Sequence, residues 1–306
     1  MNFDETQVIS ALAEIFRADH AGVLVGIGDD GAVVATSPTS IITTDMAVEG
    51  THFNIDWSGA FDIGRKITAA NLADIYAMGG LPQYLVVALT LSGEETMEWI
   101  KDLAHGIAHE AHSCGAAVVG GDLTRGAIKT ISITAVGSVE TALTRGGAQI
   151  GDLIYISSLP GWSCAGLSLI DSDQVDDLEA YAIEQFNAPS IDYSAAVAMA
   201  KAGATSMCDV SDGLVVQAGQ MADAAGLSFS FNTDDFKQEP EFVALDELAK
   251  KHGVDVWQWI FAGGEDHIFL ATGEALPGLC VGRVIEGSGV TGLEMKKAPE
   301  IWRHFQ

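Results

Sequence analysis

Apolar and polar residues alternate along this chain in two rhythms, one typical of helices and the other typical of strands. Apolar residues recur three and four positions apart over residues 4–18, which predicts an amphipathic helix. Three short runs rich in β-branched residues follow at 23–27, 32–36 and 41–44, and each run predicts a strand. A helix followed by several strands indicates the start of a mixed α/β arrangement.

A longer helix is predicted over residues 61–78, where Gly79-Gly80 ends the apolar pattern. Asn71 and Asp74 are three positions apart on this helix, so they share one of its faces. The helix therefore combines a buried apolar side with a polar pair. The apolar residues expected to face inward are Ile63, Ile67, Ile75 and Met78.

The next segment predicts a strand, a helix and two further strands. Residues 84–91 form a continuous apolar run, which is typical of a buried strand. Ser92 and Glu95 have the spacing of a capping box, which predicts a helix over 93–113. The two further strands are expected at 116–120 and 130–138.

Glycines interrupt the pattern near residues 140–151, and a second set of helices and strands follows. We therefore expect two mixed α/β domains, residues 1–142 and residues 143–306. The expected elements of the second domain are helices near 163–171, 191–202 and 212–225, and strands near 153–157, 205–209, 227–231, 267–271 and 279–284.

The charge balance limits the kinds of partner that this chain can attract. Acidic residues number 42 and basic residues 15, which gives a formal net charge of −27. No basic footprint is left to attract a nucleic acid or an anionic membrane, so we expect neither as a partner. An acidic protein that binds polyanions must recruit cations to do so. With 48% hydrophobic and only 19% charged residues, the chain can bury a substantial core.

The cysteines and the first residues of the sequence indicate a cytoplasmic location. None of the cysteines has CxxC spacing, and all stand in apolar surroundings, which is typical of buried free thiols in a reducing compartment. The first six residues lack the basic start and apolar core of a signal peptide. No run of about 18 apolar residues is present, so we expect no span of a bilayer. The cysteines are Cys114, Cys164, Cys208 and Cys280.

Six short acidic motifs stand beside glycine or at the end of an apolar run. Carboxylates are ligands for hard cations, and Mg²⁺ is usually held by one or two carboxylates together with substrate phosphates. The motifs therefore predict a site for several metal ions and a polyphosphate. Taken alone, each motif also fits a turn between strands or a helix N-cap. The motifs span residues 28–31, 43–45, 71–74, 120–122, 209–213 and 263–266.

Other nucleotide and metal motifs are rejected or absent. Residues 26–31 have the spacing GxGxxG, but two aspartates would face the pyrophosphate and an extended segment follows where a helix is needed. The sequence contains no P-loop and neither HRD nor DFG, which excludes Walker-type and protein-kinase sites. His105, His109 and His112 share one helix face and could bind zinc, but no carboxylates surround them, so an exposed or interface face is favoured.

Seven segments occur in one order between residue 26 and about residue 271: GIGDDGAVV, TTDMAVEGTHF, KITAANLADIYAMGGLP, VVGGDLTRG, TRGGAQIGDLIYIS, CDVSDGL and GGEDHIFL. This set resembles the thiamine-monophosphate kinase family, of the superfamily that includes aminoimidazole-ribonucleotide synthetase. The resemblance implies transfer of the ATP γ-phosphate to thiamine monophosphate, giving thiamine diphosphate. It also implies two mixed α/β domains of the synthetase type and a homodimer whose N-terminal sheets form a barrel.

The resemblance further implies roles for individual residues. Several Mg²⁺ ions are expected on Asp30, Thr43, Thr44, Asp45, Asp74, Asp122, Asp209 and Asp212. ATP is expected to contact Gly121, Asp122, Arg145 and Ser211. Thiamine monophosphate is expected to contact His52, Glu265 and Trp302. No general base is required, because a phosphate monoester with a second pKa near ~6 is already ionised at neutral pH.

Three positions depart from the family pattern. The segment 187–191 lacks the arginine that the family usually carries there, and Pro160-Gly161-Trp162 alters a glycine-aspartate turn. His267 stands where an aromatic residue is usual. The metal ligands are intact. Two alternatives to the kinase remain: another ATP-using enzyme of the same superfamily, similar to aminoimidazole-ribonucleotide synthetase, and a degenerate homologue that binds nucleotide without catalysis.

Overall fold

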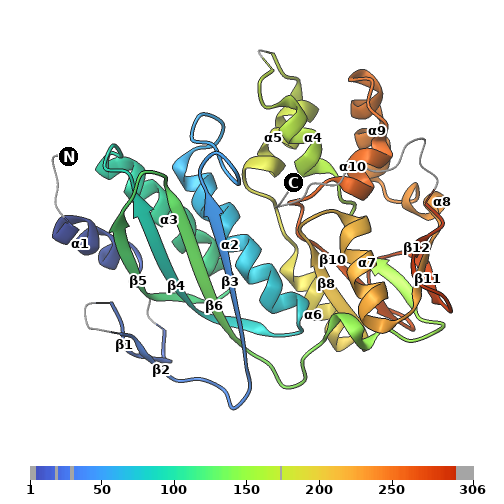
Figure 1. Cartoon of the computed structure of the whole chain (residues 1–306), viewed down its shortest axis with the longest axis horizontal. Helices are drawn as coiled ribbons and strands as arrows, with labels where there is room; N and C mark the ends of the chain where they lie inside the picture. Colours follow the sequence, from blue (N-terminus) through green and yellow to red (C-terminus); the bar gives the residue numbers. More distant parts are fainter. Residues whose placement is uncertain (1–4, 18–19, 28–30, 173, 294–306) are drawn as a thin grey trace. The chain divides into compact units, whose positions relative to one another are not determined.

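The computed structural model describes residues 5–17, 20–27, 31–172 and 174–293 (Figure 1). The chain divides into two compact units, one formed by residues 1–76 and 80–140 and the other by residues 77–79 and 141–306. Each unit contains both helices and strands, which confirms the expected mixed α/β content.

The N-terminal unit is built on a four-stranded sheet with the strand order β3-β6-β4-β5. Strand β6 pairs antiparallel with β3 and β4, whereas β4 and β5 are parallel. Helix α3 is the crossover between the two parallel strands, as such a connection requires. The elements are α1 (Glu5–Ile15), β1 (Val23–Val25), β2 (Val33–Val34), β3 (Ser40–Val48), α2 (Ala60–Ala77), β4 (Leu81–Leu91), α3 (Met97–Ser113), β5 (Ala117–Arg125) and β6 (Thr130–Ser138).

Helix α2 packs against one face of this sheet. A Cβ built on Gly137 of β6 would lie 2.4 Å from the side chain of Ile75 on α2, so the two elements touch there. Figure 1 shows α2 and α3 on the same side of the sheet. Because side chains alternate between the two faces of a strand, the odd-numbered residues of β3 and β6 face the helices. Ile131, Ile133 and Ala135 are accordingly buried.

The opposite face of the sheet is covered only in part within the described residues. Tyr84, Ala117 and Val119 pack against Val23 and Val34 of the small β1–β2 pair. Elsewhere on this face, large apolar side chains reach solvent: the exposed fraction is 69% for Ile42, 59% for Met46 and 41% for Val86.

The C-terminal unit holds a six-stranded sheet with the order β12-β9-β11-β7-β10-β8. Its strands pair antiparallel except for β12 with β9. Its elements are the short helix η1 (Arg145–Gly147), β7 (Leu153–Ile156), α4 (Trp162–Leu169), α5 (Asp177–Asn187), α6 (Tyr193–Lys201), β8 (Ser206–Val210), α7 (Leu214–Ala225), β9 (Ser228–Phe231), α8 (Thr233–Phe236), α9 (Glu241–Lys251), α10 (Val256–Ala262), β10 (Ile268–Gly273), β11 (Leu279–Ile285) and β12 (Gly289–Thr291).

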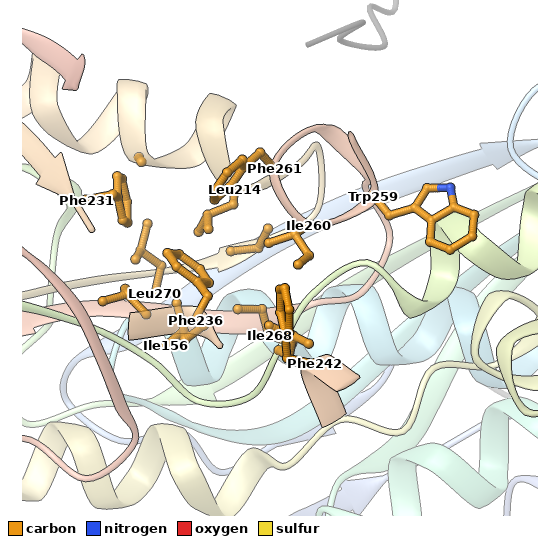
Figure 2. Close-up of a cluster of buried hydrophobic side chains, with 14 of the residues drawn as sticks. Ile156, Leu214, Phe231, Phe236, Phe242, Trp259, Ile260, Phe261, Ile268 and Leu270 are labelled. Carbon is orange, nitrogen blue, oxygen red and sulfur yellow. The ribbon is translucent and has the colours of Figure 1, made fainter. Parts of the chain in front are cut away.

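Strand β10 lies between β7 and the edge strand β8 and is buried at all six positions. Around it, aromatic and aliphatic side chains from strands and helices form a continuous core (Figure 2). Phe236 of α8 and Phe261 of α10 meet edge to face, with ring centroids 5.3 Å apart. Since α8 and α10 fill this core, the segments on either side of them are anchored to the sheet.

Several expected elements have different bounds in the structure. Helix α3 begins at Met97, not at residue 93: Thr96 is its N-cap, and Ser92 and Glu95 bond to each other in the turn before it. The residues of Thr43–Asp45 lie in the middle of β3 and those of Gly120–Asp122 lie inside β5, because pairing with neighbouring strands extends both strands.

Some expectations about burial were also wrong. Met78 is 37% exposed, because α2 ends at Ala77 and Gly79, at φ +76°, turns the chain away from the helical path. The cysteines are free, as expected, but only Cys208 is fully buried. The elements α5, α8, α9, α10 and β12 are not among those that the sequence pattern indicated.

Asp266 joins the start of β10 to the start of α4. Its two carboxylate oxygens accept hydrogen bonds from the backbone N–H groups of Gly161 (2.8 Å) and Ser163 (2.9 Å). Burial raises the pKa of this carboxyl to about 6, although the hydrogen bonds from Ser163 and Gly161 act in the opposite direction. Asp266 therefore satisfies the otherwise unpaired N–H groups at the end of a buried helix.

Replacement of Gly106 by alanine is expected to destabilise the N-terminal unit. A Cβ at this position of α3 would lie 2.0 Å from the carbonyl oxygen of Phe61 on α2, so the two helices would have to separate. Overpacking of this kind costs about 1–3 kcal/mol, which urea unfolding would measure. Gly219→Ala on α7 is the control: open space surrounds that position, and a gain of about 0.5–1 kcal/mol is expected from helix propensity. Equal effects of the two changes would contradict this account.

Asp266 is expected to make stability depend on pH. Its pKa in the folded protein, about 6, lies above the ordinary value of 3.8, so its contribution is fully present below that ordinary value and is lost as the pH rises through about 6. Between about pH 7.5 and about pH 5, the wild type should gain on the order of 1 kcal/mol relative to Asp266→Asn. Urea unfolding of both proteins at the two pH values measures this difference, and parallel pH profiles would refute it.

Candidate functional site

Three oxygen-bearing side chains lie together where β3 meets α2. The Thr43 hydroxyl donates to Asp74 Oδ2 over 2.6 Å. Asn71 is fully buried, and its side-chain oxygen accepts from the backbone N–H of Asp45 over 3.1 Å. The prediction that Asn71 and Asp74 share one helix face is therefore confirmed. Through these two bonds, α2 fixes both a carboxylate of its own and the backbone that carries Asp45.

The register of the sheet places two further candidates, Thr44 and Asp122, apart from this group. Asp45 shares a row with Ile133, Val87 and Gly121, on the face toward α2. The neighbouring row, on the opposite face, is formed by Met46, Ser132, Ala88 and Asp122. Thr44 belongs to that opposite face too, where its hydroxyl accepts from Thr134 over 3.1 Å. The structure thus brings Thr43, Asp45 and Asp74 together and places Thr44 and Asp122 on the other side of the sheet.

Gly121 has no room for a side chain. A Cβ at this position would lie 1.9 Å from the carbonyl oxygen of Val87 on the neighbouring strand. Glycine is therefore required here by the packing of β5 on β4, whether or not a ligand approaches it.

His52 is held by the loop that follows β3. Its ring atom Nδ1 accepts a hydrogen bond from the backbone N–H of Val48 over 3.2 Å. In the neutral ring, the proton must then be on Nε2, which makes His52 a donor through that atom. The backbone N–H of Gly50 donates to the carbonyl of Phe53 (2.8 Å), which closes the loop.

A buried ion network, which the sequence analysis did not identify, anchors this loop. The Lys129 ammonium lies 3.1 Å from Glu49 and 3.5 Å from Glu95. Burial tends to raise the pKa of Glu95, but hydrogen bonds from the Ser92 hydroxyl and from backbone amides outweigh it and lower the pKa to about 2. Glu95 is therefore ionised and binds the loop through Lys129. Nothing in the spacing of these residues indicates that they meet.

In the C-terminal unit, the motifs at 209–213 and 263–267 lie side by side. The backbone N–H of Glu265 donates to the carbonyl of Ser211 over 2.6 Å. A Cβ on Gly264 would lie only 2.5 Å from that same carbonyl oxygen, so glycine is needed for the approach. The expected order of a strand end, a short turn and a helix is confirmed, since β8 ends at Val210 and α7 begins at Leu214.

Gln217 of α7 orients the turn between these elements. Its side-chain NH₂ donates to the Ser211 hydroxyl (3.2 Å), and its side-chain oxygen accepts from the backbone N–H of Asp212 (3.3 Å). Gln217 is 1% exposed, so these bonds lie inside the protein. The sequence analysis did not single out Gln217, although a polar residue one turn inside an apolar helix is a signal of such a role.

The backbone is strained in the second of these two motifs, at residues 265 and 267. Glu265 and His267 have φ values of +66° and +51°, in the left-handed region that residues other than glycine rarely adopt. Such conformations cost about 1–3 kcal/mol each and persist only where the surrounding structure imposes them. Here the imposed contacts are the bond of Glu265 to Ser211 and that of the His267 N–H to the Val210 carbonyl (3.0 Å). Strain at a predicted substrate contact is consistent with a functional constraint.

The remaining candidates are less constrained or lie outside the described residues. Arg145 begins η1 and is exposed. Asp30 and Trp302 fall outside the residues that the structure describes. His105, His109 and His112 are exposed on α3. Across the described ranges, no three His, Cys, Asp or Glu side chains lie close enough to hold a metal ion, so this helix face offers no zinc site.

The chemistry of the two groups nevertheless fits a hard divalent cation. Both groups consist of carboxylate and hydroxyl oxygens: Thr43, Asp45 and Asp74 in one unit, and Asp209, Ser211 and Asp212 in the other. Oxygen donors are those that Mg²⁺ prefers, whereas zinc sites usually include nitrogen or sulfur.

A separate observation concerns membranes: among the described residues, we find no helix with the length and apolarity needed to cross a bilayer.

Comparison with known protein families identifies both units. The model of the AIR synthase related protein N-terminal domain matches residues 28–139. The model of the corresponding C-terminal domain matches residues 149–261. The two matches together cover more than half of the chain.

Curated relatives are similar over most of their length. A thiamine-monophosphate kinase of Corynebacterium glutamicum is 35% identical over 254 residues, which cover 80% of this chain and 76% of the relative. One from Mycobacterium tuberculosis is 34% identical over 277 residues, covering 89% and 82%. One from Aquifex aeolicus is 30% identical over 290 residues, covering 91% and 92%.

Solved structures agree with these relatives. The thiamine-monophosphate kinase of Stenotrophomonas maltophilia superimposes with a TM-score of 0.80 at 29% identity, over 95% of this chain and 96% of that one. AaThiL complexed with AMPPCP and TMP also gives a TM-score of 0.80, at 26% identity, over 98% and 97% of the two chains. The chain therefore belongs to the AIR synthase related family and, within it, to the thiamine-monophosphate kinases.

Proposed function

We propose that this chain transfers the γ-phosphate of ATP to thiamine monophosphate, giving thiamine diphosphate and ADP. The observation that carries the proposal is a sequence identity of 30–35% to thiamine-monophosphate kinases over most of the chain. A structural relative bound to AMPPCP and TMP supports ATP as the phosphate donor and thiamine monophosphate as the acceptor. The free cysteines are consistent with a cytoplasmic enzyme, which is part of the proposal.

In this proposal, each of two domains carries its own set of binding residues. Residues 1–142 form the domain for metal and nucleotide binding and for dimerisation, and residues 143–306 form the second α/β domain. The proposed ligands of several Mg²⁺ ions remain Asp30, Thr43, Thr44, Asp45, Asp74, Asp122, Asp209 and Asp212. Two hydrogen bonds support the part of this set that lies toward α2: the Thr43 hydroxyl donates to Asp74, and the Asp45 backbone N–H donates to the Asn71 side chain.

Positioning and electrostatics carry the proposed reaction. Two unit charges about 4 Å apart repel by about 4 kcal/mol at an effective dielectric constant of about 20, and several such pairs arise when ATP meets another phosphate. Mg²⁺ held by the carboxylates of this chain would supply the charge neutralisation that this encounter needs. The role of the carboxylates in this proposal is to hold the ions where they favour in-line transfer. No side chain has to remove a proton, because the accepting phosphate is already ionised.

The remaining contacts are those that the family resemblance implies. We assign Gly121, Asp122, Arg145 and Ser211 to ATP, and His52, Glu265 and Trp302 to thiamine monophosphate. The Val48 N–H on Nδ1 leaves His52 with its proton on Nε2, and this donor suits a phosphate oxygen. The hydroxyl of Ser211 is oriented by Gln217, which suits a fixed polar contact.

Loss of a single carboxylate should abolish turnover without unfolding the protein. In Asp45→Asn and in Asp122→Asn, kcat should fall by about 100-fold or more, because metal ions contribute several kcal/mol of charge stabilisation. A coupled assay of ADP release, with thiamine diphosphate identified as the product, measures this effect. Asp223→Asn on α7 is the matched control, since Asp223 is exposed and belongs to neither group.

The same assay separates the proposed function from its alternatives. ADP release with an aminoimidazole-pathway substrate in place of thiamine monophosphate would support a different enzyme of the superfamily. Nucleotide binding without turnover of either substrate would support a degenerate homologue. A near-normal kcat in both carboxylate variants would refute the proposed metal roles.

We also propose that the chain forms a homodimer in which the N-terminal sheets join into a barrel. The support comes from the sheet face that carries Ile42, Met46 and Val86, whose side chains are exposed in the single chain. Several large apolar side chains exposed on one sheet face commonly mark a protein interface. The occupant would be the same face of a second copy.

A charge on this face should prevent dimerisation. Met46→Glu places an unpaired carboxylate in the proposed interface and should shift the molecular mass in solution from that of a dimer to that of a monomer. Light scattering coupled to size-exclusion chromatography measures the mass. Val243→Glu on α9 is the control, because Val243 is also 60% exposed but lies in the C-terminal unit. A monomeric wild type, or a dimer that tolerates Met46→Glu, would contradict the arrangement.

A further inference from the structure

His267 and Asp209 form a buried pair in the C-terminal unit. The ring atom Nδ1 of His267 lies 2.9 Å from Oδ2 of Asp209, and the two side chains are only 8% and 5% exposed. An ionised carboxylate can only accept hydrogen bonds, so the proton of this bond belongs to Nδ1. A carboxylate this deeply buried requires such a donor, because its burial without one is costly.

The backbone holds the two side chains in this position. Strand β10 pairs with β8 so that Ile268 lies opposite Val210 and Phe269 opposite Asp209. The His267 N–H extends this ladder by one bond, to the carbonyl of Val210. His267 is thereby fixed at φ +51°, a conformation that costs free energy for a residue with a side chain. The imidazole is placed by the sheet itself.

The adjacent residues make separate contacts. Asp266 accepts from Gly161 and Ser163 at the start of α4, whereas Glu265 is bound through its backbone to Ser211. Three consecutive residues therefore bind three different elements, and His267 is the one whose side chain contacts Asp209.

We propose that His267 is a positioning residue that orients the Asp209 carboxylate for binding a divalent cation. The inference rests on the proposed function, in which Asp209 is a metal ligand. A fixed donor on one carboxylate oxygen restricts rotation of the group, so its remaining lone pairs keep one direction. Partners of this kind around a metal ligand typically change metal affinity by about 10–100-fold when they are removed.

Paired substitutions of His267 test this role. The amide nitrogen of asparagine is as many bonds from Cα as Nδ1 of histidine, and asparagine adopts left-handed φ values more readily than other residues with a side chain. His267→Asn should therefore keep the donor and the backbone. His267→Gln moves the amide one bond further out, and His267→Phe keeps a ring without any donor. The latter two should lose the bond to Asp209.

Direct binding of Mn²⁺ in the presence of AMPPCP, measured by calorimetry, is the main readout. We expect His267→Phe and His267→Gln to weaken Mn²⁺ binding by about 10–100-fold and His267→Asn to stay within a few-fold of the wild type. In turnover, the Mg²⁺ concentration for half-maximal activity should shift in the same order, while KM for thiamine monophosphate changes little. Urea unfolding of each variant shows that it remains folded.

Asp209→Asn completes the experiment. If His267 acts through Asp209, then His267→Phe should add little further loss of Mn²⁺ affinity in an Asp209→Asn background. Unchanged Mn²⁺ binding in Asp209→Asn, or in a folded His267→Phe, would overturn the inference. Equal losses in the Asn and Gln variants would also overturn it, since the position of the donor would then not matter. Because the binding readout needs no turnover, absence of thiamine diphosphate formation would count against the proposed function alone.

Discussion

Buried and half-buried carboxylates in both units depend on donors that the fold brings to them. Asp266 is held by the amides of Gly161 and Ser163, and Asp209 by the ring of His267. In the N-terminal unit, the Thr43 hydroxyl binds Asp74, and Glu95 lies within reach of Lys129. Each carboxylate would be costly to bury alone. Because each donor comes from a different element than its carboxylate, these hydrogen bonds and ion pairs hold the acidic segments against neighbouring strands and helices.

The sheets determine where each acidic group lies. Alternation along β3 sends Thr43 and Asp45 toward α2 and Thr44 to the opposite face. The parallel pairing of β4 with β5 then places Asp122 in the row of Met46, away from Asp45. In the C-terminal unit, by contrast, the antiparallel pairing of β8 with β10 brings two distant motifs into direct contact.

The least favourable backbone conformations described above occur where the motifs at 209–213 and 263–267 meet. Glu265 and His267 both have left-handed φ values, and a Cβ on Gly264 would lie only 2.5 Å from the Ser211 carbonyl oxygen of the other motif. Burial of apolar side chains in the core around β10, including Phe236 and Phe261, offsets the free-energy cost of these strained conformations. A rigid core beside a strained segment is the arrangement expected where side chains must hold a fixed direction for a ligand.

The sequence by itself determined the α/β content, most element positions and the family, because apolar periodicity and ordered motifs are local properties. It also predicted that Asn71 and Asp74 share a face, since helix geometry alone decides this. Local patterns misplaced the start of α3 and the ends of β3 and β5, where capping by Thr96 and strand pairing decide the bounds. Only the tertiary structure decided that Asp122 faces away from Asp45, that Gln217 orients Ser211 and that His267 binds Asp209, because register and long-range contacts bring together residues that no local spacing connects.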